Sequence, residues 1–159
     1  MTKNLPTFEQ KKEFLQDLDY TAVQACALYY FHNFKVESND LDTFQVSVLN
    51  NALIESSLLF LRKINEFFGC RRTECRAKDF IPEYVPVYLF ENIFDKRLID
   101  NHVCHMTYEN VIRGKINWAE FLTHYVPKAK DMFISFCKSL NKKEPDYFEG
   151  FIPLFLQRK

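Results

Sequence analysis

The chain has 159 residues, enough for one domain with a sizeable core, and its 21 basic and 21 acidic side chains cancel. A net charge of zero excludes a general electrostatic attraction to nucleic acid or to an anionic membrane. The aromatic content of 16%, with 17 phenylalanines, excludes a disordered chain and requires a thick apolar core. A single domain over residues 1–159 is therefore expected, with an apolar partner surface as a second place for these side chains.

The sequence shows no secretion signal, no apolar membrane span and no glycine-rich phosphate loop, and these absences guide what we expect of its localisation and cofactors. The opening stretch MTKNLPTFEQKKEF carries charges where a secretion signal would be apolar. No uncharged apolar run approaches the roughly 18 residues of a membrane span. Five cysteines, an odd number, favour reduced thiols, and the three glycines are too scattered for a glycine-rich phosphate loop. We expect a cytoplasmic protein without a membrane span, and no cofactor or bound metal.

The first helix is predicted to begin near Thr7, whose side chain can form a capping box with Gln10. Helical spacing of apolar residues continues to about residue 33. A second cap pattern at Thr21 and Gln24 leaves two alternatives, one long bent helix or two short collinear helices.

The second helix is predicted over about residues 41–68. Asp40 or Asp42 can cap its start, and Gly69 is a typical C-terminal stop. The helix is apolar nearly all round between Ala52 and Leu61, which is typical of a central, enclosed helix.

The rest of the chain predicts an irregular loop at about 69–88, a third helix at about 89–108 and a fourth at about 118–140. Asn117 and Glu120 form a capping-box pattern before the fourth helix.

Pro127 predicts a kink or a break in the fourth helix near Tyr125. The aromatic C-terminal tail is expected to pack on the bundle or on a neighbouring chain. The predicted fold is all-α, an antiparallel bundle of four to five helices.

Two charged residues of the second helix are candidates for a site. Glu55 and Arg62 are seven positions apart and point almost the same way, because seven steps of about 100° come close to two full turns. In one interpretation they form ion pairs with other helices. In the other, Glu55, Arg62 and Asn101 line a cleft and contact the substrate, together with the histidines of the next motif.

That motif is RLIDNHVCH, in which Arg97 precedes His102 by five positions and His105 follows one helical turn later. The pattern R-x4-H in a small helical domain resembles the HEPN superfamily (higher eukaryote and prokaryote nucleotide-binding). The resemblance implies a homodimer that binds RNA or nucleotide at the dimer interface. Many members of that superfamily are metal-independent endoribonucleases of defence or toxin–antitoxin systems.

The chemistry fits these residue types. Cleaving RNA without metal needs a base for the 2′-hydroxyl, an acid for the leaving oxygen and a cation on the phosphate. A histidine titrates in the right range for the proton transfers, and an arginine can bind phosphate oxygens in a fork. By this resemblance His102 is the acid or base, Arg97 holds the phosphate and His105 supports either role.

A second resemblance covers roughly residues 50–118. The segments NALIESSLLFLRKINEFF and NHVCHMTYENVIRGKINW are similar to uncharacterised bacterial helical proteins with E-x6-R on one helix and a histidine before a threonine. It implies that Glu55, Arg62 and His105 act together.

Two further hypotheses stand beside the nuclease. The first is a non-enzymatic protein-interaction module, in which Glu55 and Arg62 are structural and the aromatic residues serve a partner. The second is a metal-binding bundle that uses side chains from several helices. Its candidate ligands are Glu55, His102, His105, Glu120 and His124.

Overall fold

The computed structural model describes residues 6–33, 42–70, 75–91, 96, 97, 99 and 117–154, with the backbone alone for 28–33. The fold is all-α and the described residues contain no strand, which confirms the predicted class. The elements are listed here in chain order: α1 (Phe8–Asn33), α2 (Thr43–Phe68), α3 (Ala77–Phe80), α6 (Trp118–Lys143) and the 3-10 helix η2 (Pro145–Phe148). Most of the helix predicted at 89–108 lies outside the described residues.

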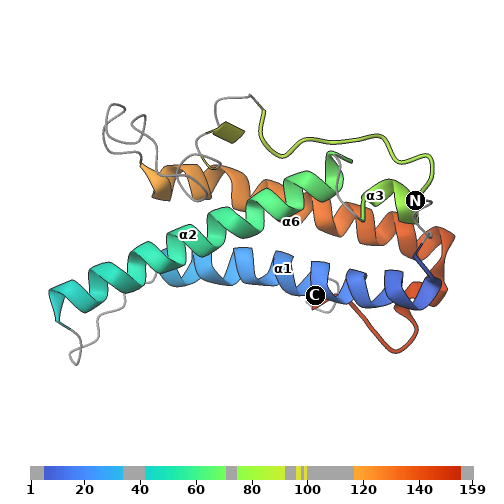
Figure 1. Cartoon of the computed structure of the whole chain (residues 1–159), viewed down its shortest axis with the longest axis horizontal. Helices are drawn as coiled ribbons and strands as arrows, with labels where there is room; N and C mark the ends of the chain where they lie inside the picture. Colours follow the sequence, from blue (N-terminus) through green and yellow to red (C-terminus); the bar gives the residue numbers. More distant parts are fainter. Residues whose placement is uncertain are drawn as a thin grey trace, which may run out of the picture.

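The three long helices α1, α2 and α6 pack on one another. In Figure 1, α2 and α6 run in the same direction and α1 runs in the opposite one, and the N-terminal end of α2 projects beyond the other two helices. The segment 81–91 returns along the bundle in an irregular conformation, as predicted up to residue 88. Residues 89–91, predicted to begin the third helix, are not helical, and the predicted loop contains the short helix α3.

The helix ends follow the predicted caps. Thr7 and Gln10 exchange side-chain to backbone hydrogen bonds at the start of α1, and Asp42 and Gln45 do the same at α2. The side chain of Asn117 accepts a hydrogen bond from the N–H three residues on, at the start of α6. Each cap satisfies backbone donors that a helix leaves without a partner.

Neither α1 nor α6 is broken at the position where the sequence allowed a break. α1 is one continuous helix through residues 19–21, which decides for the single-helix alternative. α6 is continuous across Pro127, so there is no break near Tyr125. Burial of Tyr125, Val126 and Ala129 on one face of α6 offsets the loss of the backbone donor at the proline.

An aromatic cluster joins four helices. Phe14 of α1 stacks on Phe67 of α2 with ring centroids 5.8 Å apart, and Phe136 of α6 packs edge-on against Phe67 at 5.3 Å. Phe80 of α3 contacts both Phe67 and Phe136 at 5.9 Å. Such edge-to-face pairs add to the burial of apolar surface. The phenylalanine excess of the sequence is therefore explained in large part by this core.

The C-terminal tail packs on the bundle up to its last described residue. Phe151 packs against the core and Pro153 is buried. Both carboxylate oxygens of Asp19, in α1, accept the backbone N–H of Leu154, at 3.2 and 3.3 Å. The tail prediction is confirmed for this segment.

The prediction that α2 is enclosed between Ala52 and Leu61 is only half right. The side chains from Ser57 onward include the buried Leu58, Leu61 and Ile64. Ala52 is exposed because it lies in the N-terminal half of α2, which extends past the ends of its neighbours. Leu59 lies beside the buried Leu58 and is exposed because it points away from the core.

Candidate functional site

The predicted catalytic strip is only partly described by the structure. Arg97 is exposed, whereas Asn101, His102 and His105 lie outside the described residues. That Arg97 and His102 act together in one site thus stays a prediction.

Glu55 and Arg62 do share one face of α2, as their spacing predicts. Arg62 Nε donates to Glu66 Oε1 at 3.2 Å, an i,i+4 ion pair in which both side chains are 30% exposed. Glu55 is exposed and forms no ion pair with any residue that the structure describes. Its apolar sequence neighbours did not imply burial, since Ala52 and Leu59 beside it are exposed as well.

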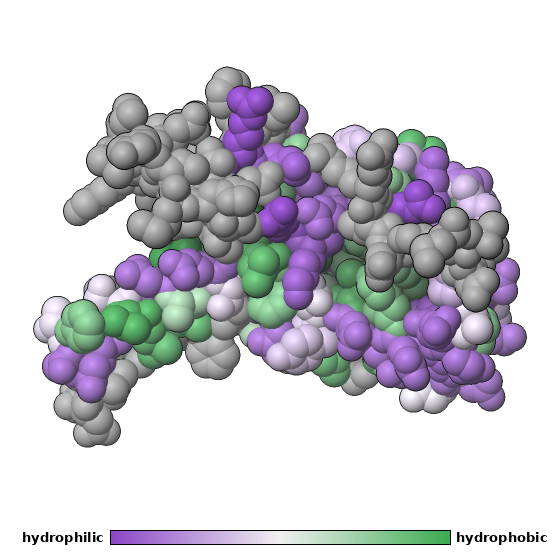
Figure 2. Space-filling model, in the orientation of Figure 1, coloured by the Kyte–Doolittle hydropathy of each residue, from purple (hydrophilic) through white to green (hydrophobic). Residues whose placement is uncertain are grey.

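The exposed side of α2 carries a continuous line of side chains, here called the outer face of α2. Its members are the exposed Phe44, Val48, Ala52, Glu55 and Leu59 and the half-buried Arg62. Phe44 is 75% exposed and Val48 52%. Figure 2 shows hydrophobic side chains gathered on the projecting end of the molecule. Contiguous exposed apolar side chains of this kind mark interaction surfaces more often than isolated ones do.

By length and composition alone, α2 could also cross a membrane. Its most apolar 18-residue window has a mean hydropathy of 1.3, and 17% of that window is buried. Core helices of soluble proteins reach similar values, although they are mostly buried. The low burial here comes from the projecting N-terminal half.

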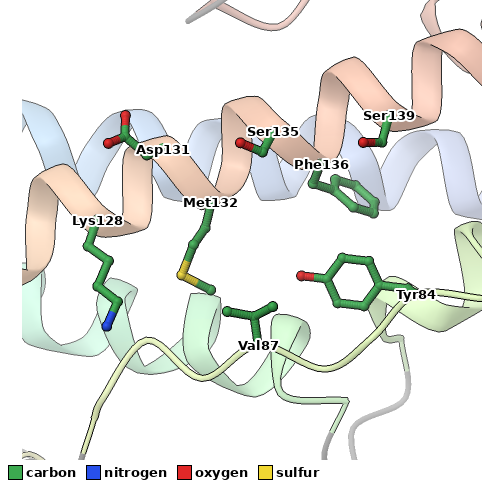
Figure 3. Close-up of a pocket in the computed structure, with 8 residues that line it drawn as sticks. All are labelled: Tyr84, Val87, Lys128, Asp131, Met132, Ser135, Phe136 and Ser139. Carbon is green, nitrogen blue, oxygen red and sulfur yellow. The ribbon is translucent and has the colours of Figure 1, made fainter.

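A second feature is a groove between the segment 81–91 and α6. It has a volume of about 540 Å³. Met132 and Phe136 project from α6 toward Tyr84 and Val87 (Figure 3). Burial raises the pKa of the Tyr84 hydroxyl to about 12, so this group stays protonated at neutral pH and can donate a hydrogen bond.

One polar residue that lines this groove, Lys128, forms an ion pair. Lys128 Nζ lies 2.9 Å from Glu91 Oε1, and His124 Nε2 lies 3.8 Å from the same oxygen. The pKa of Glu91 is lowered, first by the hydrogen bond from Lys128 and then by its charge. The groove is thus lined by the apolar Val87, Met132 and Phe136 together with the polar Asp131, Ser135 and Ser139, and its one lysine is paired with Glu91.

The metal hypothesis gains no site from the described residues. No three His, Cys, Asp or Glu side chains among them lie close enough to hold an ion. Glu120 accepts from the side-chain amide of Asn117 at 3.3 Å, and His124 faces Glu91 instead of Glu120. The predicted ligand pair Glu120–His124 is therefore used for a helix cap and a surface ion pair.

Two thiols that the structure describes, those of Cys75 and Cys26, are poor nucleophiles. Burial raises the pKa of Cys75 to about 11, and the smaller opposing effects of Lys11 and Arg76 do not reverse it. Burial also raises the pKa of Cys26 to about 11. A thiolate is the reactive form, so neither group points to covalent catalysis.

The sequence interpretation missed both the outer face of α2 and the groove. A signal for the first was present, because Phe44 and Val48 continue the apolar pattern four positions apart right after the cap at Asp42. Comparison of the chain with protein-family models, with curated proteins and with solved structures finds no significant match.

Proposed function

We propose that this protein is a helical protein-interaction module whose docking surface is the outer face of α2. The observation that carries the proposal is the exposure of Phe44 and Val48 on a helix end that projects from the bundle. Burying such side chains against a partner removes apolar surface from water at roughly 25 cal/mol per Å².

The rest of α2 supports a surface built for contact. The helix is capped at Asp42 by a complete capping box, so the projecting end is held as a helix without help from a neighbour. The other end is fixed in the core through Leu61, Ile64 and Phe68. A preformed helix face loses little conformational entropy when it binds.

Photo-crosslinking tests this function directly. The photoreactive p-benzoylphenylalanine replaces Phe44 in one version of the chain and Val85 in another. Both native side chains are 75% exposed, but Val85 lies on the segment 81–91, away from the outer face of α2. We expect protein adducts from position 44 that disappear on adding Val48→Asp. Equal adduct formation at the two positions, or none at 44, contradicts the proposal.

A second function rests on the R-x4-H pattern and on the exposure of Arg97. We propose that the Arg97 end of the chain binds RNA or nucleotide as a HEPN-like homodimer, with Arg97 on the phosphate and His102 transferring the proton. The exposure of Arg97 leaves its guanidinium accessible to a phosphate.

Binding and cleavage are measured separately for this second function. Filter binding of a labelled RNA is expected to weaken in Arg97→Ala. RNA decay in the presence of a chelator is expected to disappear in His102→Ala and to change in His105→Ala. Intact RNA after incubation with the wild-type dimer rejects cleavage, and equal RNA affinity in Arg97→Ala rejects the binding site.

A further inference from the structure

Resting on the proposed docking function, we propose that the partner of the outer face of α2 is a second copy of the same chain. The two α2 helices pack antiparallel about a two-fold axis that passes near Leu59. Three features carry this inference: the spacing of exposed and half-buried residues along α2, the order of their charges, and the aromatic ring of Tyr88 at the end of the line.

The spacing on α2 is that of a helix-pairing seam. The positions recur at alternating intervals of four and three residues: Val48, Ala52, Glu55, Leu59, Arg62 and Glu66. An average of about 3.5 residues per repeat keeps such a line on one side of a helix, where a partner helix can follow it. The line lies opposite the buried side of α2, which holds Leu61, Ile64 and Phe68. Its C-terminal part is half-buried, since Glu66 also lines a groove with residues of α1.

The line does not end at Glu66. Gly69 follows three positions later on the same side, and the ring of Tyr88 covers it. A Cβ at Gly69 would come within 2.8 Å of Tyr88 Cε1. Tyr88 is itself 48% exposed. The seam therefore begins with exposed apolar side chains at Phe44 and Val48 and finishes with an exposed aromatic ring.

When two copies of this line of side chains are placed antiparallel, acidic residues of one copy face basic residues of the other. In an antiparallel pair centred on Leu59, the residue numbers of facing positions add up to about 118. Glu55 then faces the partner's Arg62, and Leu59 faces the partner's Leu59. Because the axis is two-fold, the acid–base pair occurs twice.

The ends of the seam match in the same register. Val48 faces the partner's Gly69, where the exposed ring of the partner's Tyr88 lies. Apolar side chains thus meet an aromatic ring at both ends, the two ion pairs lie between, and a leucine pair lies at the centre. Opposite charges in facing seam positions set the orientation and register of paired helices.

The Nε bond of Arg62 to Glu66 is compatible with this arrangement. A guanidinium has five N–H donors in a fork, so it can bind two carboxylates at once. Glu66 on one side and the partner's Glu55 on the other would place Arg62 between two acids. The existing i,i+4 pair holds the arginine on this side of α2.

A second copy fits the outer face of α2 better than a lipid surface does. Helices that lie on membranes carry Lys or Arg along their polar face, and α2 has neither between Asp42 and Leu61. An acidic residue in the middle of the apolar line, Glu55, is costly in lipid and favourable opposite an arginine.

Charge reversal tests the pairing. Sedimentation equilibrium measures the dimer dissociation constant of the full chain for wild type, Glu55→Arg, Arg62→Glu and the double variant. We expect each single reversal to weaken the dimer on the order of tenfold or more, and the double variant to recover most of the loss, because the swapped charges again face each other. Glu13→Arg, an exposed carboxylate on α1, is the matched control and should leave the dimer unchanged.

A crosslink tests the position of the axis without relying on charge. With a short bis-maleimide reagent, Leu59→Cys is expected to join two chains above the wild-type background, because position 59 faces itself across the axis. Ala52→Cys should not, since it faces the partner's Glu66. The crosslinking experiment remains valid if Arg62→Glu fails to fold. Circular dichroism shows whether that variant is folded.

The outcomes separate this inference from the function beneath it. If the chain stays monomeric at every concentration, the inference that the partner is a second copy is wrong. The adducts from position 44 then decide alone whether the outer face of α2 docks a protein. If the dimer dissociation constant is unchanged in both Glu55→Arg and Arg62→Glu, the dimer uses another surface and the inference is also wrong. Flotation with phosphatidylcholine vesicles that is lost in Phe44→Ser identifies lipid as the occupant and overturns it as well.

Discussion

The side-chain oxygen of Asn65, in α2, accepts a hydrogen bond from the backbone N–H of Leu89 at 2.9 Å in the core. The same oxygen accepts from the N–H of Phe90 at 3.4 Å, and Asn65 is only 1% exposed. One buried amide thus satisfies two donors of an irregular segment that has no helix or sheet to pair with. It fixes the segment 81–91 to the bundle and so shapes the groove beside α6.

The first prediction concerns this amide. Asn65→Leu keeps the branched shape of the side chain but leaves two buried N–H groups without an acceptor. We expect it to lower the free energy of unfolding by about 2 kcal/mol or more, measured by urea denaturation. Asn141→Leu, an exposed position on α6, should change it by less than about 0.5 kcal/mol. Similar losses in the two variants would contradict the role given to Asn65.

The second prediction concerns Gly69 and the ring above it. A Cβ at this position would lie 2.8 Å from both the backbone oxygen of Asn65 and Tyr88 Cε1. We expect Gly69→Ala to destabilise the fold by about 1–3 kcal/mol, because the ring and the helix end must separate. In Tyr88→Ala the same substitution should cost less, since one of the two clashes is gone. Strictly additive losses in this double-mutant cycle would show that the ring does not contact Gly69.

Local rules recovered the helix boundaries. The caps at Thr7, Asp42 and Asn117 each depend on residues only three positions apart, and the stop at Gly69 depends on one. The same rules also allowed breaks in α1 and α6 that the structure does not have. Pro127 costs one backbone hydrogen bond, but the buried face of α6 around it holds the helix together.

The sequence could not predict the tertiary features, because these depend on which helix surfaces pack against each other. The pattern around Ala52 shows that α2 is apolar, yet only the packing of α1 and α6 decides which half of it is covered. Nothing near Asp19 or Asn65 in the sequence indicates that their partners lie at Leu154 and Leu89. The histidine strip stays a prediction for a different reason, since His102 lies outside the described residues.

The third prediction uses the pH dependence of Asp19, which is 3% exposed. Burial raises the pKa of this carboxyl above its ordinary value of 3.8, although the hydrogen bond from Leu154 lowers it in part. A raised pKa in the folded state means that the folded chain binds this proton more tightly than the unfolded chain does. The stabilisation from protonated Asp19 is therefore fully present below about pH 3.8 and is lost as the pH rises through the raised value.

Asp19→Asn removes this ionisation and keeps an oxygen that can accept from Leu154. We expect it to have a higher Tm than wild type at pH 7, with a difference that shrinks as the pH falls below 4. Circular dichroism melts between pH 3.5 and 8 measure it. Asp17→Asn, exposed on the same helix, reports the general effect of removing one negative charge. A Tm difference for Asp19→Asn that does not depend on pH would rule out the buried ionisation.

The fourth prediction compares two phenylalanines of α2 that differ in exposure. Phe68 is fully buried in the aromatic cluster, and Phe44 is 75% exposed on the projecting end. We expect Phe68→Ala to lower the free energy of unfolding by about 3–5 kcal/mol and Phe44→Ala to change it by less than about 0.5 kcal/mol. Urea denaturation at a concentration where the chain is monomeric makes the comparison. A large loss in Phe44→Ala under those conditions would mean that this ring already packs within its own chain, and the outer face of α2 would then have no apolar end to offer a partner.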